Sequence, residues 1–335
     1  MPRISRPRLG ALILIMLIAS GWVLVWHAAI PPIQAPSKTA FAPEQIERGA
    51  VLTAVGDCAV CHTAGGGRSY AGGRAVPTPF GTVYATNITP DPETGIGRWS
   101  EAAFQRTMRD GIVRSGRHLY PVLPYPHFTR ATDQDIAAMY AFLMTRAPVS
   151  QTTPPNHDLP FPLNMRVLLA GWNLLYLKPG PWQPDPAHDA TWNRGAYLTE
   201  AIGHCGACHT PHNALGAERN SEKLAGGQAE NWYAPALQEA SPAAEPWTEE
   251  SLTAYLRTGL DARHGAAAGP MTEVTEQLAR VPEPDVRAMA VYVASLMPKS
   301  APASKATPEP NAARDARDSR CSPAPAAVAM QRMHP

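Results

Sequence analysis

Two copies of the pattern Cys-x-x-Cys-His contain the residues with the clearest chemistry in this chain. They are Cys58–His62 and Cys205–His209. Two thiols three residues apart on a short helix can each form a thioether bond with a vinyl group of one porphyrin, and the adjacent imidazole then lies beneath the iron as a ligand. This is the attachment pattern of a c-type haem. The sequence therefore predicts two covalently bound haems, attached through Cys58, Cys61, Cys205 and Cys208, with His62 and His209 as axial ligands.

Two other kinds of site use paired cysteines, and the surrounding sequence disfavours both. A zinc ribbon needs a second Cys or His pair about 12 to 20 residues further on. Neither motif has a Cys pair there, and His212 follows the second motif too closely. A thioredoxin-like redox pair needs no following histidine and lies in a βαβ pattern, whereas these motifs lie among helical and irregular segments.

The sixth position of each iron is either occupied by a protein ligand or open. A protein ligand there is typical of electron transfer, whereas an open position allows chemistry at the iron. In the second half of the chain, Gly269-Pro270-Met271 places a methionine in a loop before the last predicted helix. Met271 is therefore the predicted distal ligand of the second haem. The alternative is a methionine that only fills space in the core.

The corresponding loop of the first half, residues 118–127, has Leu123 where a methionine would be expected. A leucine side chain has no atom that can bind iron. His127 is the predicted distal ligand of the first haem, because imidazole is a common iron ligand. Four other residues stay open as rivals, namely His118, Met108, Met139 and Met144.

The composition limits the kind of protein. A chain of 335 residues with 44% hydrophobic residues and a net charge of +1 fits two modest domains, and nothing in it points to nucleic acid. The 36 prolines and the 17% charged residues fit loop-rich domains around an apolar cofactor. Four of the five cysteines belong to the two motifs, so no structural disulfide is expected.

The amino-terminal segment has the pattern of a membrane anchor. Arg3, Arg6 and Arg8 precede an uncharged run, Leu9–Ile30, which as a helix is long enough to span a bilayer. The run is longer than the apolar region of a signal peptide, and no clear Ala-x-Ala precedes Pro31. We expect an uncleaved transmembrane helix with the arginines inside. This places the protein at a bacterial inner membrane with its haem domains in the periplasm.

The chain contains an internal duplication. Arg48–Thr53 precedes the first motif as Arg194–Thr199 precedes the second. Three further pairs follow in the same order: Ala71–Gly73 with Ala225–Gly227, Arg109–Gly111 with Arg257–Gly259, and Asp135–Met139 with Asp285–Met289. Each half is therefore predicted to be one haem domain.

Each half is predicted to begin and end with a helix. Pro43 and Glu44 are good first-turn residues, and apolar residues recur at helical spacing before the motifs and in both closing segments. In a c-type fold the first and last helices cross. Gly49 and Gly195, at matching positions of the two halves, would let the two backbones approach closely.

The predicted domain organisation has five parts: an amino-terminal tip and anchor (1–36), a first haem domain (41–150), a proline-rich linker (151–190) with one packed helix within Phe161–Leu177, a second haem domain (191–298) and a disordered tail (299–335).

Several of these segments together resemble one family. They are Arg48–Thr63, Thr78–Gly81, Asn87–Asp91, Thr94–Gly97, Trp99, Leu119–Pro121, Tyr140–Arg146, Trp192–Tyr197 and Gly269–Met271. From about residue 20 to 298 the chain resembles the membrane-anchored multihaem cytochrome c subunits of bacterial dehydrogenases, most of all those of molybdenum hydroxylases for nicotinate, isoquinoline or aldehydes. Related subunits serve quinoprotein alcohol dehydrogenase and flavin-dependent gluconate dehydrogenase. We therefore expect an all-α fold of two tandem class I cytochrome c-like domains with long loops, behind the transmembrane helix.

The resemblance also implies a function. Such subunits accept electrons from a dehydrogenase catalytic subunit, with molybdopterin and iron–sulfur subunits among the implied partners, and pass them to quinone or a cytochrome oxidase without bond chemistry of their own. Those subunits usually carry a third haem domain beyond the point where this chain reaches Pro298. Here that region has Cys321 without a second cysteine or a following histidine, so two haems are expected.

Two alternatives belong to other functional classes. A dihaem cytochrome c peroxidase also has two such motifs, and it needs a ligand-free iron with acid–base groups above it. A gas or redox sensor would need an attached output domain, and none is visible in the sequence.

Overall fold

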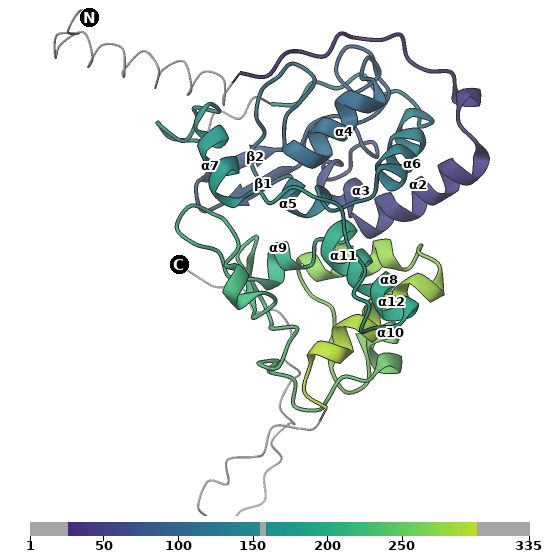
Figure 1. Cartoon of the computed structure of the whole chain (residues 1–335), viewed down its shortest axis with the longest axis vertical. Coiled ribbons are helices and arrows are strands. Elements are labelled where there is room, and N and C mark those ends of the chain that lie inside the picture. Colours follow the sequence, from purple (N-terminus) through teal and green to yellow (C-terminus); the bar gives the residue numbers. More distant parts are fainter. Residues whose placement is uncertain (1–25, 155–158, 300–335) are drawn as a thin grey trace, which may run out of the picture. The chain divides into compact units, whose positions relative to one another are not determined.

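The structure is a computed structural model that describes residues 26–154 and 159–299 (Figure 1). The chain divides into two compact units, of which the first runs to Gln183 and the second begins at Pro184. The boundary thus falls within the predicted linker (151–190), whose residues up to Gln183 belong to the first unit.

The first unit contains short helices and one hairpin. Its elements are η1 (Lys38–Ala40), α2 (Pro43–Val55), α3 (Cys58–Cys61), β1 (Ala75–Thr78), β2 (Gly81–Tyr84), α4 (Glu101–Asp110), α5 (Tyr125–Phe128), α6 (Asp133–Met144) and α7 (Leu168–Tyr176). Pro43 occupies the first turn of α2, where its missing N–H costs no hydrogen bond. The Ser100 and Thr132 side chains cap α4 and α6 by accepting hydrogen bonds from backbone N–H groups of the first turn.

The second unit repeats this order with small differences. Its elements are α8 (Ala190–Tyr197), the π-helix η2 (Leu198–Ile202), α9 (Gly206–His209), η3 (Asn220–Glu222), β3 (Gly227–Ala229), β4 (Trp232–Ala234), α10 (Glu249–Thr258), β5 (Leu260–Asp261), β6 (Gly265–Ala266), α11 (Pro270–Leu278) and α12 (Glu283–Leu296). The Asp189 side chain caps α8, and the Thr248 and Ser251 side chains form a capping box at α10.

In each predicted haem domain (41–150 and 191–298) the first helix packs against the last at a glycine. α2 contacts α6, and α8 contacts α12 (Figure 1). A Cβ atom on Gly49 would lie 2.0 Å from the Ala138 carbonyl oxygen, and one on Gly195 would lie 1.8 Å from the Ala288 carbonyl oxygen. No side chain fits at such distances, so the predicted role of both glycines in close backbone packing is confirmed.

An ion pair joins the same two helices in each unit. Arg48 donates a hydrogen bond to the buried Asp135 carboxylate, and Arg194 makes a two-fold contact with Asp285 at 2.8 and 2.9 Å. These four residues belong to the duplicated segments, so the duplication preserves the link between the first and last helices.

The π-helix η2 accommodates one extra residue. Gly49 lies nine residues before Cys58, whereas Gly195 lies ten residues before Cys205. A π turn closes with one more residue than an α turn, so the insertion is absorbed between Leu198 and Ile202. The buried Glu200 in this turn accepts hydrogen bonds from Lys223 and Tyr292.

The expectation of an all-α fold is wrong. Three two-stranded antiparallel sheets, β1–β2, β3–β4 and β5–β6, accompany the helices in the described part of the chain. Their strands have two to four residues. Strands this short have too few alternating positions to give a recognisable pattern in the sequence.

The predicted amino-terminal anchor is corrected as well. The sequence predicts a helix that continues to Ile30, whereas residues 26–37 form no helix. Instead, Ile30 and Ile33 donate backbone hydrogen bonds to the carbonyls of Arg114 and Arg98 in the first unit. Residues 9–25 lie outside the described ranges. Within 26–154 and 159–299 no helix has the length and apolar character to cross a membrane. The prediction of an inner-membrane anchor with periplasmic haem domains, as made, is therefore wrong.

One loop of the first unit supports a prediction about acid stability. Asp91 accepts hydrogen bonds from the Thr94 backbone N–H, the Thr94 hydroxyl and the Glu93 N–H, and these bonds lower the pKa of its carboxyl. A lowered pKa in the folded state stabilises the fold above the unfolded-state pKa of about 3.9, and this stabilisation is lost as pH falls through the folded-state value. Asp91→Asn should thus destabilise the protein at pH 6, with a difference from wild type that shrinks below about pH 4. Urea unfolding across this range measures it, and a pH-independent difference would refute the role of the charge.

Candidate haem-binding sites

Each Cys-x-x-Cys-His motif forms one helical turn. The His62 N–H donates to the Cys58 carbonyl at 3.0 Å, and the His209 N–H donates to the Cys205 carbonyl at 3.0 Å. Residues four apart in a helical turn lie on the same side, so each histidine lies beneath the first cysteine of its motif. All four motif cysteines are half-buried and outside any disulfide. Both turns therefore present two thiols and an imidazole together.

A backbone carbonyl orients each of the two imidazoles. His62 Nδ1 lies 2.6 Å from the Thr86 carbonyl oxygen, and His209 Nδ1 lies 2.7 Å from the Pro235 carbonyl oxygen. A carbonyl accepts only, so Nδ1 carries the proton and Nε2 presents its lone pair. Burial lowers the pKa of both histidines, which favours the neutral imidazole that iron binding requires. This donor set fits a proximal haem ligand in each unit.

Two of the small hairpins supply these carbonyls. Thr86 follows strand β2, and Pro235 directly follows strand β4. Sequence reasoning did not predict either residue. The signal that could have found them is the dipeptide Tyr-Ala, which precedes both residues, at Tyr84-Ala85 and Tyr233-Ala234. The strands missed from the sequence thus hold the predicted ligands in position.

Duplicated glycines secure the chain after each motif. The Gly72 N–H donates to the His62 carbonyl at 2.8 Å, and the Gly226 N–H donates to the His209 carbonyl at 2.8 Å. A Cβ atom on Gly72 would lie 2.5 Å from the Asn87 nitrogen, and one on Gly227 would lie 2.3 Å from the Cys208 carbonyl oxygen. The backbone therefore leaves no room for a side chain at Gly72 in the first unit or at Gly227 in the second.

The site does not fit the alternative uses of paired cysteines. Burial raises the pKa of Cys58 to about 12, so its thiol is protonated near neutral pH. A redox-active pair needs a thiolate, so this protonation disfavours such a pair at the first motif. Among the described residues no group of three or more His, Cys, Asp or Glu side chains is placed to hold a metal ion.

Met271 lies in the first turn of α11 and is half-buried. The chain reaches it through Gly269, which has φ 56° and whose Cβ would lie 2.5 Å from the Trp232 ring. Trp232 is on β4, the strand that leads to Pro235. The start of the helix that carries Met271 therefore packs on the same hairpin that orients His209, whereas the sequence predicted a loop at Met271.

The candidates in the first unit occupy different surroundings. His127 lies on α5, half-buried, between the buried Tyr125 and Phe128. The His118 ring packs edge-to-face on the His27 ring, with the centroids 5.2 Å apart. The three methionine rivals are buried side chains on α4 and α6, namely Met108, Met139 and Met144.

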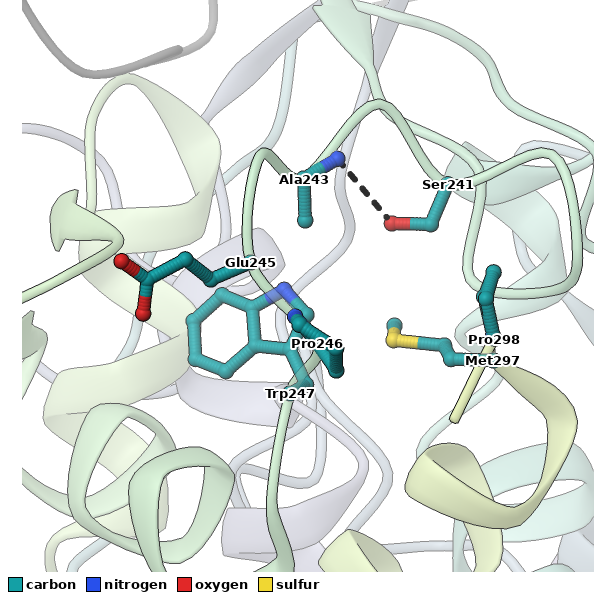
Figure 2. A pocket seen from close by; sticks show the side chains of 7 residues that line it. All are labelled: Ser241, Ala243, Glu245, Pro246, Trp247, Met297 and Pro298. Carbon is teal, nitrogen blue, oxygen red and sulfur yellow. Dashed lines mark hydrogen bonds between the residues drawn. The ribbon is translucent and has the colours of Figure 1, made fainter. Parts of the chain in front are cut away.

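A small pocket in the second unit is separate from these residues. Figure 2 shows it between the loop at Ser241–Trp247 and the end of α12, with the Met297 and Trp247 side chains in its wall. Its volume of about 10 Å³ leaves room for about one water molecule. None of its lining residues is a predicted haem contact.

Comparison with known proteins shows one consistent family. Residues 46–147 match the family model for cytochrome c. A nicotinate dehydrogenase subunit of Pseudomonas putida is 53% identical over 82% of this chain and 23% of its own length. The fructose dehydrogenase cytochrome subunit of Gluconobacter japonicus is 40% identical over 76% of the chain and 53% of its own length.

A third relative is matched over most of its length. The diheme cytochrome c-type protein of Cereibacter sphaeroides is 36% identical over 74% of this chain and 85% of its own length. By contrast, the chain spans about a quarter and about half of the two dehydrogenase subunits. Together with the geometry of the two motifs, these matches show that the chain belongs to the cytochrome c family and that it binds haem c covalently.

Proposed function

We propose that the chain is a dihaem c-type cytochrome that carries single electrons from a dehydrogenase catalytic subunit to an acceptor. The observation that supports this most strongly is the repeated arrangement of thiols, imidazole and orienting carbonyl in both units. One haem at each motif would supply one-electron redox chemistry. The relatives found are dehydrogenase subunits and a diheme cytochrome, which does not favour the peroxidase alternative.

In this proposal the chain's own residues hold and tune the two haems. Cys58 and Cys61 attach the first haem, and Cys205 and Cys208 attach the second. His62 and His209 bind through Nε2 while Nδ1–H donates to Thr86 or Pro235, which fixes the plane of each ring. Met271 is the proposed distal ligand of the second haem. For the first haem, His127 stays a prediction from the sequence alone.

The proposed electron donor is a dehydrogenase catalytic subunit, which the similarity to a nicotinate dehydrogenase subunit supports. The family resemblance in the sequence further implies a molybdenum hydroxylase with molybdopterin and iron–sulfur subunits. Quinone or a cytochrome oxidase is the proposed acceptor. The chain itself would make and break no substrate bonds.

This function is tested by redox titration of the haem-loaded wild-type chain and, in parallel, of its Met271→Leu variant. We expect two one-electron waves in the wild type. The variant should lower one potential by on the order of 0.1 V or more, since methionine ligation raises haem potentials and axial ligands span a range of roughly 0.8 V. Met297→Leu is the matched control, because Met297 is buried in the wall of the small pocket. A single wave in the wild type, or equal shifts in both variants, would contradict the proposal.

A further inference from the structure

In each unit, the segment that follows the glycine at the end of α4 or α10 contains the expected position of the distal iron ligand, and we call it the distal loop. The two distal loops begin with the same backbone hydrogen bond. Gly111 and Gly259 end α4 and α10 with φ of 64° and 71°. The Leu119 N–H then donates to the Gly111 carbonyl at 2.7 Å, as the Ala267 N–H donates to the Gly259 carbonyl at 2.7 Å. Leu119 and Ala267 are therefore equivalent positions at the start of the loop.

The loops also end at the same hydrogen-bond pattern. The Thr129 N–H donates to the Tyr125 carbonyl at 2.9 Å, as Ala279 does to Thr275 at 2.9 Å. The next two bonds also match. The Arg130 N–H donates to the His127 carbonyl as the Arg280 N–H donates to the Gln277 carbonyl. The Ala131 N–H donates to the Phe128 carbonyl as the Val281 N–H donates to the Leu278 carbonyl. His127 is consequently equivalent to Gln277.

When the two units are aligned by these hydrogen bonds, the position of His127 does not correspond to the position of Met271. Gln277 follows Met271 by six residues in the same helix α11, which is a rise of about 9 Å along the axis and a different face. A side chain at the Gln277 position therefore does not replace a thioether at the Met271 position.

The residues equivalent to Met271 are hydrocarbon. Met271 is the fourth residue after Ala267, and Leu123 is the fourth after Leu119. Counted back from the end of the loop, Met271 is the fourth residue before Thr275, and Pro121 is the fourth before Tyr125. The loop of the first unit is two residues shorter, so the thioether position corresponds to the stretch Pro121–Leu123. No side chain there has a donor atom.

The polar side chain next to this stretch, Tyr120, is engaged elsewhere. The Arg166 guanidinium lies over the Tyr120 ring at 4.4 Å from its centroid. Met108, Met139 and Met144 are 5%, 0% and 2% exposed on α4 and α6, where they form part of the core. The His118 ring packs on the His27 ring.

From this register we infer that the first haem has a hydrocarbon distal face in place of a methionine ligand, and that its iron binds a neutral diatomic molecule from solution. This inference rests on the proposed function, because it requires a haem at Cys58 and Cys61. A neutral diatomic is the fitting class of ligand, since an apolar face without hydrogen-bond donors disfavours an anion such as cyanide. The second haem, with Met271 as its distal ligand, should be closed to the same molecule.

Carbon monoxide is the probe for this open position. We expect the reduced, full-length, two-haem chain to bind one CO per chain in a spectroscopic titration. Met271→Leu should raise this to two per chain, because it gives the second haem the same hydrocarbon residue. Leu123→Met, a swap of similar volume, should weaken CO binding at least tenfold by supplying a thioether. Loss of the high-spin signal of the oxidised first haem in Leu123→Met provides an independent readout.

The outcomes separate this inference from the proposed function. Haem content is measured before CO is added, and a chain without a haem at Cys58 and Cys61 overturns the proposed function and the inference together. A two-haem chain that binds no CO overturns the inference alone. If His127→Ala then binds one CO where the wild type binds none, His127 is the distal ligand. Wild-type CO affinity in Leu123→Met would refute the equivalence of Leu123 and Met271.

Discussion

Alanine at Gly49 or Gly195 is expected to destabilise the affected unit strongly and to lower the yield of its haem-loaded form. The added Cβ would lie 2.0 Å or 1.8 Å from a carbonyl oxygen of the closing helix. The contact is with backbone on both sides, so rotation of a side chain cannot relieve it. Overpacking of this kind costs about 3 kcal/mol or more, a large part of the 5–15 kcal/mol that stabilises a typical domain. The yield of haem-loaded protein and its urea midpoint measure the effect.

Gly171→Ala is the matched control for these two variants. Gly171 also lies inside a helix, α7, but nothing is within 4 Å of the position its Cβ would take. Alanine is a better helix former than glycine by about 1 kcal/mol, so this variant should be as stable as the wild type or slightly more stable. Equal loss of stability in Gly171→Ala and Gly49→Ala would show that the close backbone contact at Gly49 does not decide the outcome.

Alanine at both Cys58 and Cys61 is expected to remove one covalent haem and leave the other. Each thioether pair holds its own porphyrin, so the effect should be confined to the motif that is changed. The mass of the intact chain, expressed with the haem attachment machinery, should fall from that of two haems to that of one. Cys205 and Cys208 changed together should give the same mass, and all four changes should give a chain without haem.

The fifth cysteine is the control for this series. Cys321 lies outside both motifs, so Cys321→Ser should keep two haems. A wild-type chain that carries no attached haem under these conditions would refute the haem sites altogether. A chain that loses both haems when only Cys58 and Cys61 are changed would show that the two units do not mature independently.

The residues that could be predicted from the sequence are those with a strong local signal. The two motifs have a fixed spacing, and the helices at Pro43, Ile136 and Met289 have clear periodicity, so α2, α6 and α12 are confirmed. The role of Gly49 and Gly195 followed from their matching positions in the duplication. In each case the relevant information lies within a few residues or is repeated in the other half.

The features that could not be predicted depend on contacts between distant segments. Thr86 and Pro235 act through backbone carbonyls, which carry no side-chain signature, and the hairpins that deliver them have strands of three or four residues. The apolar run that ends at Ile30 matched the composition of an anchor, but its last residue, Ile30, donates a backbone hydrogen bond to the Arg114 carbonyl. Composition alone does not separate these two uses of an apolar segment.

The extra residue in η2 has a consequence for how such domains diverge after gene duplication. The crossing at Gly195 and the attachment turn at Cys205 are both fixed by close contacts, and the buried π turn lies between these two fixed points. A π turn closes with one residue more than an α turn, so one extra residue is accommodated there while both fixed points are kept. A sequence pattern that places the first cysteine nine residues after the crossing glycine would match the first unit and miss the second.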